Sequence, residues 1–285
     1  MTLCIIRELI LEFRMHIRDD LKKLKIICFA ALLFIVPSFY IASLVQTCMN
    51  VAETSKINVY TKDTFFGWYS NNTLVSCILL FSFEIVMFQQ CYLLPGFCVI
   101  FCIFSYEIMD QGITCFQKKL YSSHKRGFEH FARCYSTYTS RIFFCISHLE
   151  HTLSLLLTLL QGYLIWNIFH TTSYLAKHSI RVMGLFAALT EIISLGVTAF
   201  MYLWLNMSAA KIHNSAIGVK NSVFKIVADV ALTEEKRCSL ILEMATDFPS
   251  KVVITGWKLF PCKREIIMKT AGAVFTYGMI LAQIE

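Results

Sequence analysis

The chain has 285 residues, of which 56% are hydrophobic and 16% are charged, and its formal net charge is +7 at pH 7. A soluble globular domain averages about 45–50% apolar and about 25% charged residues, so this composition excludes that class. The 24 Phe and 12 Cys beside only 4 Pro exclude a disordered chain and a collagen-like chain, and the charge is too low for a coiled coil. An integral membrane protein remains. We therefore predict an all-α, polytopic helical bundle whose helices cross the membrane in segments of about 20 residues.

Five apolar segments are long enough to cross the membrane, and they cover residues 26–48, 74–104, 143–170, 182–205 and 266–284. The segment 74–104 would be about 46 Å long as one helix, which exceeds a hydrocarbon core of about 30 Å. We therefore expect this segment to tilt, to project into water or to break at Pro95–Gly96.

The segments between these spans differ in their content of Lys and Arg. Residues 1–25, 105–142 and 206–265 together hold 21 of these cations, whereas the loops 49–73 and 171–181 together hold 4. Because Lys and Arg are retained on the cytoplasmic side, the first three segments are expected in the cytosol. The N-terminus is then cytoplasmic and the C-terminus extracellular. The net charge therefore indicates membrane topology rather than binding to nucleic acid.

Two local patterns fit this topology. Asn71, Asn72 and Thr73 form a glycosylation sequon with Asn71 as the acceptor, in a loop expected outside the cell, unless the three residues occur together by chance. Residues 1–25 carry acidic and basic side chains that would interrupt the core of a signal peptide. Their apolar residues recur at steps of three and four, which predicts an amphipathic cytoplasmic helix.

The sequence shows no signature of an enzyme, a cofactor or a metal site. The GxSxG, HExxH, Walker A and GxGxxG motifs are absent, so no enzymatic activity and no cofactor are expected. Cysteines inside the apolar segments, such as Cys77 and Cys102, are expected to act as small hydrophobic residues rather than as a disulfide framework. His148, Glu150 and His151 have no further ligand nearby in the sequence, which favours hydrogen bonding between helices or an interfacial position over metal binding.

Polar residues within the spans suggest a binding pocket. Counted from the outer edge at about 1.5 Å per residue, four spans bring a polar or phenolic group to one level in the outer half of the membrane. With neighbours nearer the surface, the candidate pocket residues are Tyr40, Glu84, Gln161, Trp166, Asn167, His170, Phe186 and Glu191. Such groups are costly in lipid, so they either line an aromatic pocket for a small organic ligand or hydrogen-bond between helices. The sequence leaves both interpretations open.

The last apolar segment, 266–284, is short and rich in small residues. Tyr277, Met279, Ile280 and Gln283 lie near its outer end. Several copies of this segment around one axis would form an apolar constriction below a ring of polar groups, an arrangement used in channel gates.

Residues 276–283 contain Thr-Tyr, five mostly apolar residues and Gln. This pattern resembles the C-terminal signature of the arthropod gustatory receptors, a family of seven-span chemosensory receptors related to insect odorant receptors. Upstream, Gly256–Pro261 resembles the Gly-aromatic turn of the family, with one apparent extra residue. The pattern of loops resembles the family over the whole chain. Ile284 departs from it, because an aromatic residue often follows the Gln.

The resemblance implies a ligand-gated cation channel of the plasma membrane that acts in taste and sensory transduction. It implies a homo- or hetero-tetramer of related subunits, with Tyr277, Met279, Ile280 and Gln283 near the gate of a central pore. A helix at residues 234–248, with Leu240, Ile241, Met244 and Phe248 at helical spacing, would help to anchor the subunits in the cytosol. The ligand, a small organic tastant, would bind in the pocket described above.

The five spans would correspond to the third to seventh spans of the family, so the chain is expected to lack the first two. A truncated, non-conducting subunit is therefore one alternative. A G-protein-coupled receptor is a second, although its Asp-Arg-Tyr and Asn-Pro-x-x-Tyr motifs are absent. A transporter is a third, although no internal repeat is visible.

Overall fold

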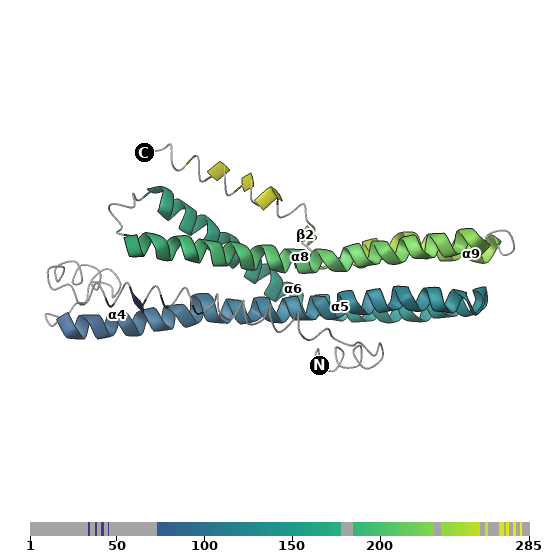
Figure 1. Ribbon diagram of the computed structural model, residues 1–285, viewed down its shortest axis with the longest axis horizontal. Helices are drawn as coiled ribbons and strands as arrows, with labels where there is room; N and C mark the ends of the chain where they lie inside the picture. The colour runs from purple at the N-terminus through teal and green to yellow at the C-terminus, as the bar shows by residue number, and fades with distance from the viewer. Residues whose placement is uncertain are drawn as a thin grey trace. The chain divides into compact units, whose positions relative to one another are not determined.

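The computed structural model describes residues 73–177, 185–230, 235–256 and 260–261, together with single helical positions elsewhere. These positions are residues 34, 38, 41, 42, 45, 268–270, 272, 273, 276, 277 and 280. Apart from one pair of two-residue strands, the regular structure of the described chain is helical (Figure 1). The fold class expected from the composition is thereby confirmed.

The helices follow one another along the chain with short connections. Their bounds are α4 at Thr73–Phe88, the π-helix η2 at Gln89–Leu93, α5 at Leu94–His124, α6 at Phe128–Lys177, α8 at Leu185–Val230 and α9 at Glu235–Lys251. Within the described residues, α5, α6 and α8 each contain a segment long and apolar enough to cross a membrane. The chain is therefore an all-α, multi-pass membrane protein.

The predicted span 74–104 contains a change of helix type. α4 passes into η2 at Gln89, and η2 passes into α5 at Leu94. Pro95 is the second residue of α5 and directly follows the turn of η2; because it has no N–H, it cannot close a helical hydrogen bond to a preceding carbonyl, and its ring crowds the preceding turn. The irregularity thus lies directly before Pro95 rather than at Pro95–Gly96, and α5 continues well beyond residue 104.

The described chain forms two compact units. Unit 1 contains residues 99–163, 202–230, 235–256 and 260–261 and the helical positions 268–270, 272 and 273. Unit 2 contains residues 73–98, 164–177 and 185–201 and the helical positions 34, 38, 41, 42, 45, 276, 277 and 280. The three long helices α5, α6 and α8 therefore each contribute residues to both units.

An aromatic cluster forms part of the core of unit 1. Phe116 of α5 lies with its ring centroid 6.1 Å from that of Tyr135 on α6 and 6.3 Å from that of Phe248 on α9. Phe143 of α6 lies 5.5 Å from Phe248. Pairs of this kind contribute about 0.5–1.5 kcal/mol beyond the burial of their area. The cluster therefore joins α5, α6 and α9.

The structure confirms the helix expected at residues 234–248, because α9 spans Glu235–Lys251. Its buried face is only partly the predicted one. Ile241 and Phe248 are buried as expected, but Leu240 is 63% exposed and Met244 is 42% exposed. The buried positions follow steps of three and four through Cys238, Ile241, Ala245 and Phe248, and this phase leaves Leu240 and Met244 on the opposite side.

The segment that resembles the Gly-aromatic turn contains a small antiparallel strand pair. Strand β1 is Thr255–Gly256 and strand β2 is Phe260–Pro261, with Thr255 opposite Pro261 and Gly256 opposite Phe260. The Oγ1 hydroxyl of Thr255 donates a hydrogen bond to Oε1 of Glu150 on α6. Glu150 therefore ties α6 to β1, a role close to the interhelical hydrogen bond expected for its cluster.

The cysteines behave mostly as expected from their apolar surroundings. Cys98, Cys102 and Cys145 are not in disulfides, and Cys102 is buried. Cys77 is a correction, because the structure places it in a disulfide. An apolar run gives no sign of pairing, since a disulfide depends on which second thiol the tertiary fold brings near.

Candidate functional site

Gln161, a predicted pocket residue, is buried between α6 and α8 in unit 1. Its Nε2 donates a hydrogen bond to Oδ1 of Asn206 over 3.0 Å. The Nδ2 of Asn206 in turn donates to the backbone carbonyl of Tyr202 over 2.9 Å. Gln161 therefore takes part in hydrogen bonding between helices, which is the second of the two interpretations that the sequence left open.

The same group of polar residues reaches the segment 266–284. The hydroxyl of Tyr202 donates a hydrogen bond to Oγ1 of Thr270 over 2.8 Å. Thr270 is one of the described helical positions in that segment. Gln161, Asn206, Tyr202 and Thr270 thus form a polar chain that joins α6, α8 and the last segment within unit 1. Sequence reasoning did not select the last three residues, although an Asn at the end of a span was an available signal.

The other predicted pocket residues that the structure describes belong to unit 2. Trp166 and His170 lie one turn apart on α6 with their ring centroids separated by 6.5 Å, and both are exposed. Asn167 and Glu191 are half-buried. Tyr40 lies outside the described residues, as do the side chains of Glu84 and Phe186. Among the predicted pocket residues, Trp166 and His170 contact each other, and Gln161 contacts Asn206, which is not one of them.

A polar contact in unit 2 was missed by sequence reasoning. The hydroxyl oxygens of Tyr92, on the π-helix η2, and Ser194, on α8, lie 2.6 Å apart. Ser194 is buried, and so are Thr190 and Thr198, which lie one turn before and after it on the same face of α8. The steps of four between these hydroxyl residues were the available signal. Thr190, Ser194 and Thr198 form a hydroxyl stripe of three buried side chains, and Ser194 contacts the π-helix η2 through Tyr92. A π-helix is a distortion that occurs often at functional sites.

The predicted gate residues are partly described. Tyr277 and Ile280 occupy helical positions, and both side chains are exposed. The ring of Tyr277 packs edge-on against Phe169 of α6 with centroids 6.4 Å apart. Met279, Gln283 and the sequon residue Asn71 lie outside the described residues. Exposed apolar side chains on the last segment suit a contact with another subunit or with lipid.

The polar contacts described above, from Gln161 to Thr270 in unit 1 and between Tyr92 and Ser194 in unit 2, are made by neutral amides and hydroxyls. Such groups can hydrogen-bond an uncharged organic molecule or hold helices in one arrangement, and neither role needs a bond to be made or broken. In the parts of the chain that the structure describes, no group of three or more His, Cys, Asp or Glu side chains is placed to hold a metal ion.

No protein-family profile matches the chain, and no curated protein matches it. Among solved structures, the chain is similar to the insect olfactory receptor OR5 from Machilis hrabei, with a TM-score of 0.64 and 12% identity over 92% of this chain and 68% of that chain. The structure of the same receptor in complex with eugenol matches over the same shares, with 12% identity and a TM-score of 0.53. At this identity the likeness establishes the fold: the chain is folded like an insect olfactory receptor.

Proposed function

We propose that the chain is a subunit of a chemosensory receptor of the insect type that acts as a ligand-gated cation channel, with a gustatory role. The observation that carries the proposal is the likeness to the fold of OR5 over 92% of the chain. Two sequence features support the gustatory branch: the pattern at residues 276–283 and the turn at Gly256–Pro261, where the structure forms the pair β1–β2.

The channel is a homo- or hetero-tetramer of related subunits in the plasma membrane. Its N-terminus lies in the cytosol and its C-terminus outside, as the distribution of Lys and Arg indicates. The last helix of each subunit lines the pore, with Tyr277, Met279, Ile280 and Gln283 as gate candidates. The side chains of Tyr277 and Ile280 are exposed in the single chain, which supports a position at the pore or at a contact between subunits of the tetramer.

The ligand is a small organic tastant that binds in unit 2. The neighbour with bound eugenol supports a ligand of this size and chemistry. Tyr92 and the hydroxyl stripe supply hydrogen-bonding groups, and Trp166 and His170 supply aromatic surface. We expect the remaining predicted pocket residues to line the same site: Tyr40, Glu84, Asn167, Phe186 and Glu191.

Opening follows from a difference in ligand affinity between two conformations. A ligand shifts the equilibrium only as far as it binds the open conformation more tightly than the closed one. The polar chain from Gln161 to Thr270 offers a physical route by which a change in α6 or α8 can reach the gate candidates. It joins these two helices to the segment that carries the gate candidates.

The proposal is tested by recording cation currents from cells that express the chain at their surface, during exposure to a panel of small organic compounds. We expect ligand-evoked currents in wild type. Ser194→Ala removes the hydroxyl that contacts Tyr92 and should shift the half-maximal ligand concentration by about tenfold, the effect of losing about 1.4 kcal/mol of hydrogen bonding.

Ser82→Ala is the matched control. The exposed Ser82 hydroxyl bonds only the Ile78 carbonyl of its own helix in the described contacts, so its loss should leave the ligand response unchanged. Surface expression without current for any compound would contradict the channel. Equal shifts for the two variants would contradict the assignment of the pocket to the hydroxyl stripe.

A further inference from the structure

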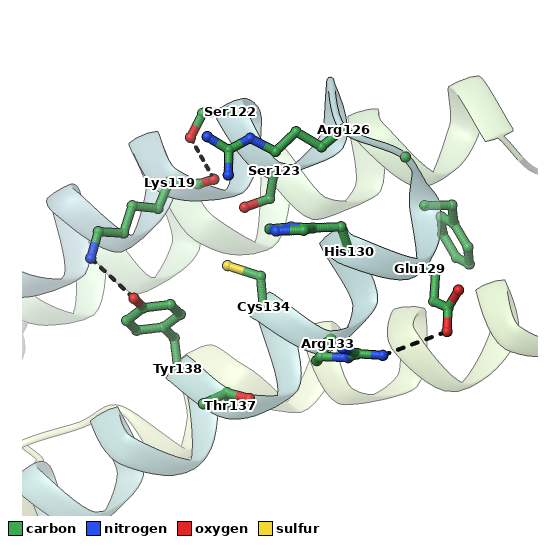
Figure 2. A pocket seen from close by; sticks show the side chains of 12 residues that line it. Lys119, Ser122, Ser123, Arg126, Glu129, His130, Arg133, Cys134, Thr137 and Tyr138 are labelled. Atoms are coloured by element: carbon green, nitrogen blue, oxygen red, sulfur yellow. Dashed lines mark hydrogen bonds and ion pairs between the residues drawn. The ribbon is translucent and has the colours of Figure 1, made fainter.

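The hairpin between α5 and α6 contains a hollow, lined by apolar surface and by several charged and hydroxyl side chains, that the proposed channel function does not use. The hollow lies in unit 1 and has a volume of about 790 Å³ (Figure 2). Its walls come from the last turns of α5, from the connecting turn and from the first turns of α6. Small-molecule sites typically have volumes of about 300–1,000 Å³, so the hollow is large enough for a metabolite.

A tight turn brings these walls together. The N–H of Arg126 donates to the carbonyl of Ser123, and the N–H of Gly127 donates to that of His124, each over 3.0 Å. Gly127 has φ of 113°, a conformation that other residues rarely adopt. The N–H of Phe131 then donates to the carbonyl of Gly127 and begins the regular bonding of α6. α6 therefore starts immediately after α5 ends, with one hollow between them.

Positive charge dominates the lining of the hollow. Lys119, Arg126 and Arg133 face it together with His130, whereas Glu129 is the one carboxylate among its lining residues. The Nζ of Lys119 lies 3.1 Å from the phenolic oxygen of Tyr138 and 4.7 Å from its ring centroid, so this described partner is neutral.

The carboxylate holds its cation weakly. The guanidinium nitrogen Nη2 of Arg133 lies 3.7 Å from the carboxylate oxygen Oε1 of Glu129, and the two side chains are 80% and 79% exposed. An exposed pair of this kind contributes only about 0–1 kcal/mol, so a stronger anion can displace Glu129 from Arg133. In Figure 2 the guanidinium of Arg126 extends over Ser122, and Ser123, His130 and Cys134 face the space beneath it.

The hollow also offers neutral hydrogen-bonding groups. The hydroxyls of Ser123 and Thr137 line it, and the first N–H groups of α6 have no acceptor within their own helix. Several cations along one hollow, with added hydroxyl and N–H donors, are the complement of phosphate oxygens, which accept several charge-assisted hydrogen bonds at once.

We propose that this hollow binds a polyphosphorylated small molecule, with Arg126 and Lys119 as its main phosphate contacts and Arg133 as a third cation. The inference stands apart from the channel proposal, since it concerns binding at the α5–α6 hairpin. The phosphates come from a soluble polyphosphate or from a phosphoinositide headgroup. The distance along α6 favours the soluble source, because the nine residues from Cys134 to Phe143, where the predicted span begins, extend about 14 Å.

The test uses the purified 285-residue chain in nanodiscs of uncharged lipid, titrated by calorimetry with ATP and with inositol hexakisphosphate. Arg126→Ala should weaken binding by about tenfold or more, the usual effect of losing charge-assisted hydrogen bonds. Lys125→Ala removes an equal charge from the neighbouring residue, which does not line the hollow, and should change affinity by less than about threefold. Glu129→Gln removes the competing carboxylate and should tighten binding.

A second arm distinguishes the two sources of phosphate. It measures binding of the same variants to vesicles of uncharged lipid with and without phosphatidylinositol bisphosphate. Arg126-dependent binding of a soluble probe supports the site with a soluble ligand, and Arg126-dependent binding of phosphoinositide vesicles alone supports it with a lipid headgroup. Binding to neither, or equal losses for Arg126→Ala and Lys125→Ala, would overturn the proposal.

Discussion

The side-chain amide of Gln161 donates a hydrogen bond to the side-chain oxygen of Asn206 over 3.0 Å, and both residues are buried between α6 and α8. In membrane proteins such bonds contribute about 0.6 kcal/mol on average and about 1.7 kcal/mol at most. Gln161→Ala should therefore lower the free energy of unfolding in detergent by about 1–2 kcal/mol, because Asn206 loses a buried partner.

A double-mutant cycle with Asn206→Ala isolates the bond between the two side chains. We expect a coupling energy of about 0.5–1.5 kcal/mol, measured by thermal unfolding of the purified chain. A coupling near zero, together with a large shift in ligand sensitivity for Gln161→Ala, would instead assign Gln161 to the ligand pocket.

The bond from Tyr202 to Thr270 should influence channel opening, because it joins α8 to the segment that carries the gate candidates. Tyr202→Phe and Thr270→Val each remove this bond, so each should shift the half-maximal ligand concentration in the same direction by about three- to tenfold. The double variant should shift it no further than either single change. Thr270→Ser keeps the hydroxyl and should behave as wild type, and additive effects of the two single changes would contradict the coupling.

The bond from Thr255 to Glu150 should hold the strand pair against α6. Glu150→Ala removes the acceptor, and the amides of residues 255 and 256 should then exchange hydrogen for deuterium about tenfold faster. Glu150→Gln retains an acceptor oxygen at the same place and should leave exchange nearly unchanged. The measurement is hydrogen exchange followed by mass spectrometry, and faster exchange in both variants would show that the charge rather than the hydrogen bond matters.

Two apolar residues of α9 should differ sharply in their effect on stability. Phe248 is fully buried against Phe116 and Phe143, so Phe248→Ala should reduce the free energy of unfolding by about 3–5 kcal/mol. Leu240 is 63% exposed, and Leu240→Ala should change it by no more than about 0.5 kcal/mol. Denaturant unfolding in detergent provides the comparison. If Leu240→Ala greatly reduces the free energy of unfolding of the assembled protein but not of the single subunit, Leu240 lies in a contact between subunits.

The features that follow from local pattern could be predicted from the sequence. Long apolar runs require helices in lipid, because every backbone polar group must be satisfied within its own segment. The resemblance implied a helix at residues 234–248, and the apolar residues there recur at helical steps; in the structure α9 begins one residue later, at Glu235. The strand pair at Thr255–Gly256 and Phe260–Pro261 falls in the segment that resembled a known turn.

The features that depend on tertiary contact could not be predicted in this way. Leu240 and Met244 fit the apolar pattern of α9, but the helix turns Cys238 and Ala245 inward instead. The partner of Gln161 depends on how α6 and α8 align, and a single sequence does not fix that alignment. The hollow at Arg126 likewise forms only when the hairpin closes and brings the ends of two long helices together.

The π-helix η2 has a consequence for how this chain tolerates insertion and deletion. Each hydrogen-bonded turn of a π-helix holds one residue more than an α-helical turn, so the wider turn accommodates a residue that would rotate the preceding helix by about 100° within a regular α-helix. Deleting one residue within Gln89–Leu93 would therefore restore α-helical bonding and leave Thr73–Phe88 facing nearly the same way relative to Leu94. Loss of one codon at this position should be tolerated, whereas loss of one codon within the regular part of α5 would change which faces its two ends present to their neighbours.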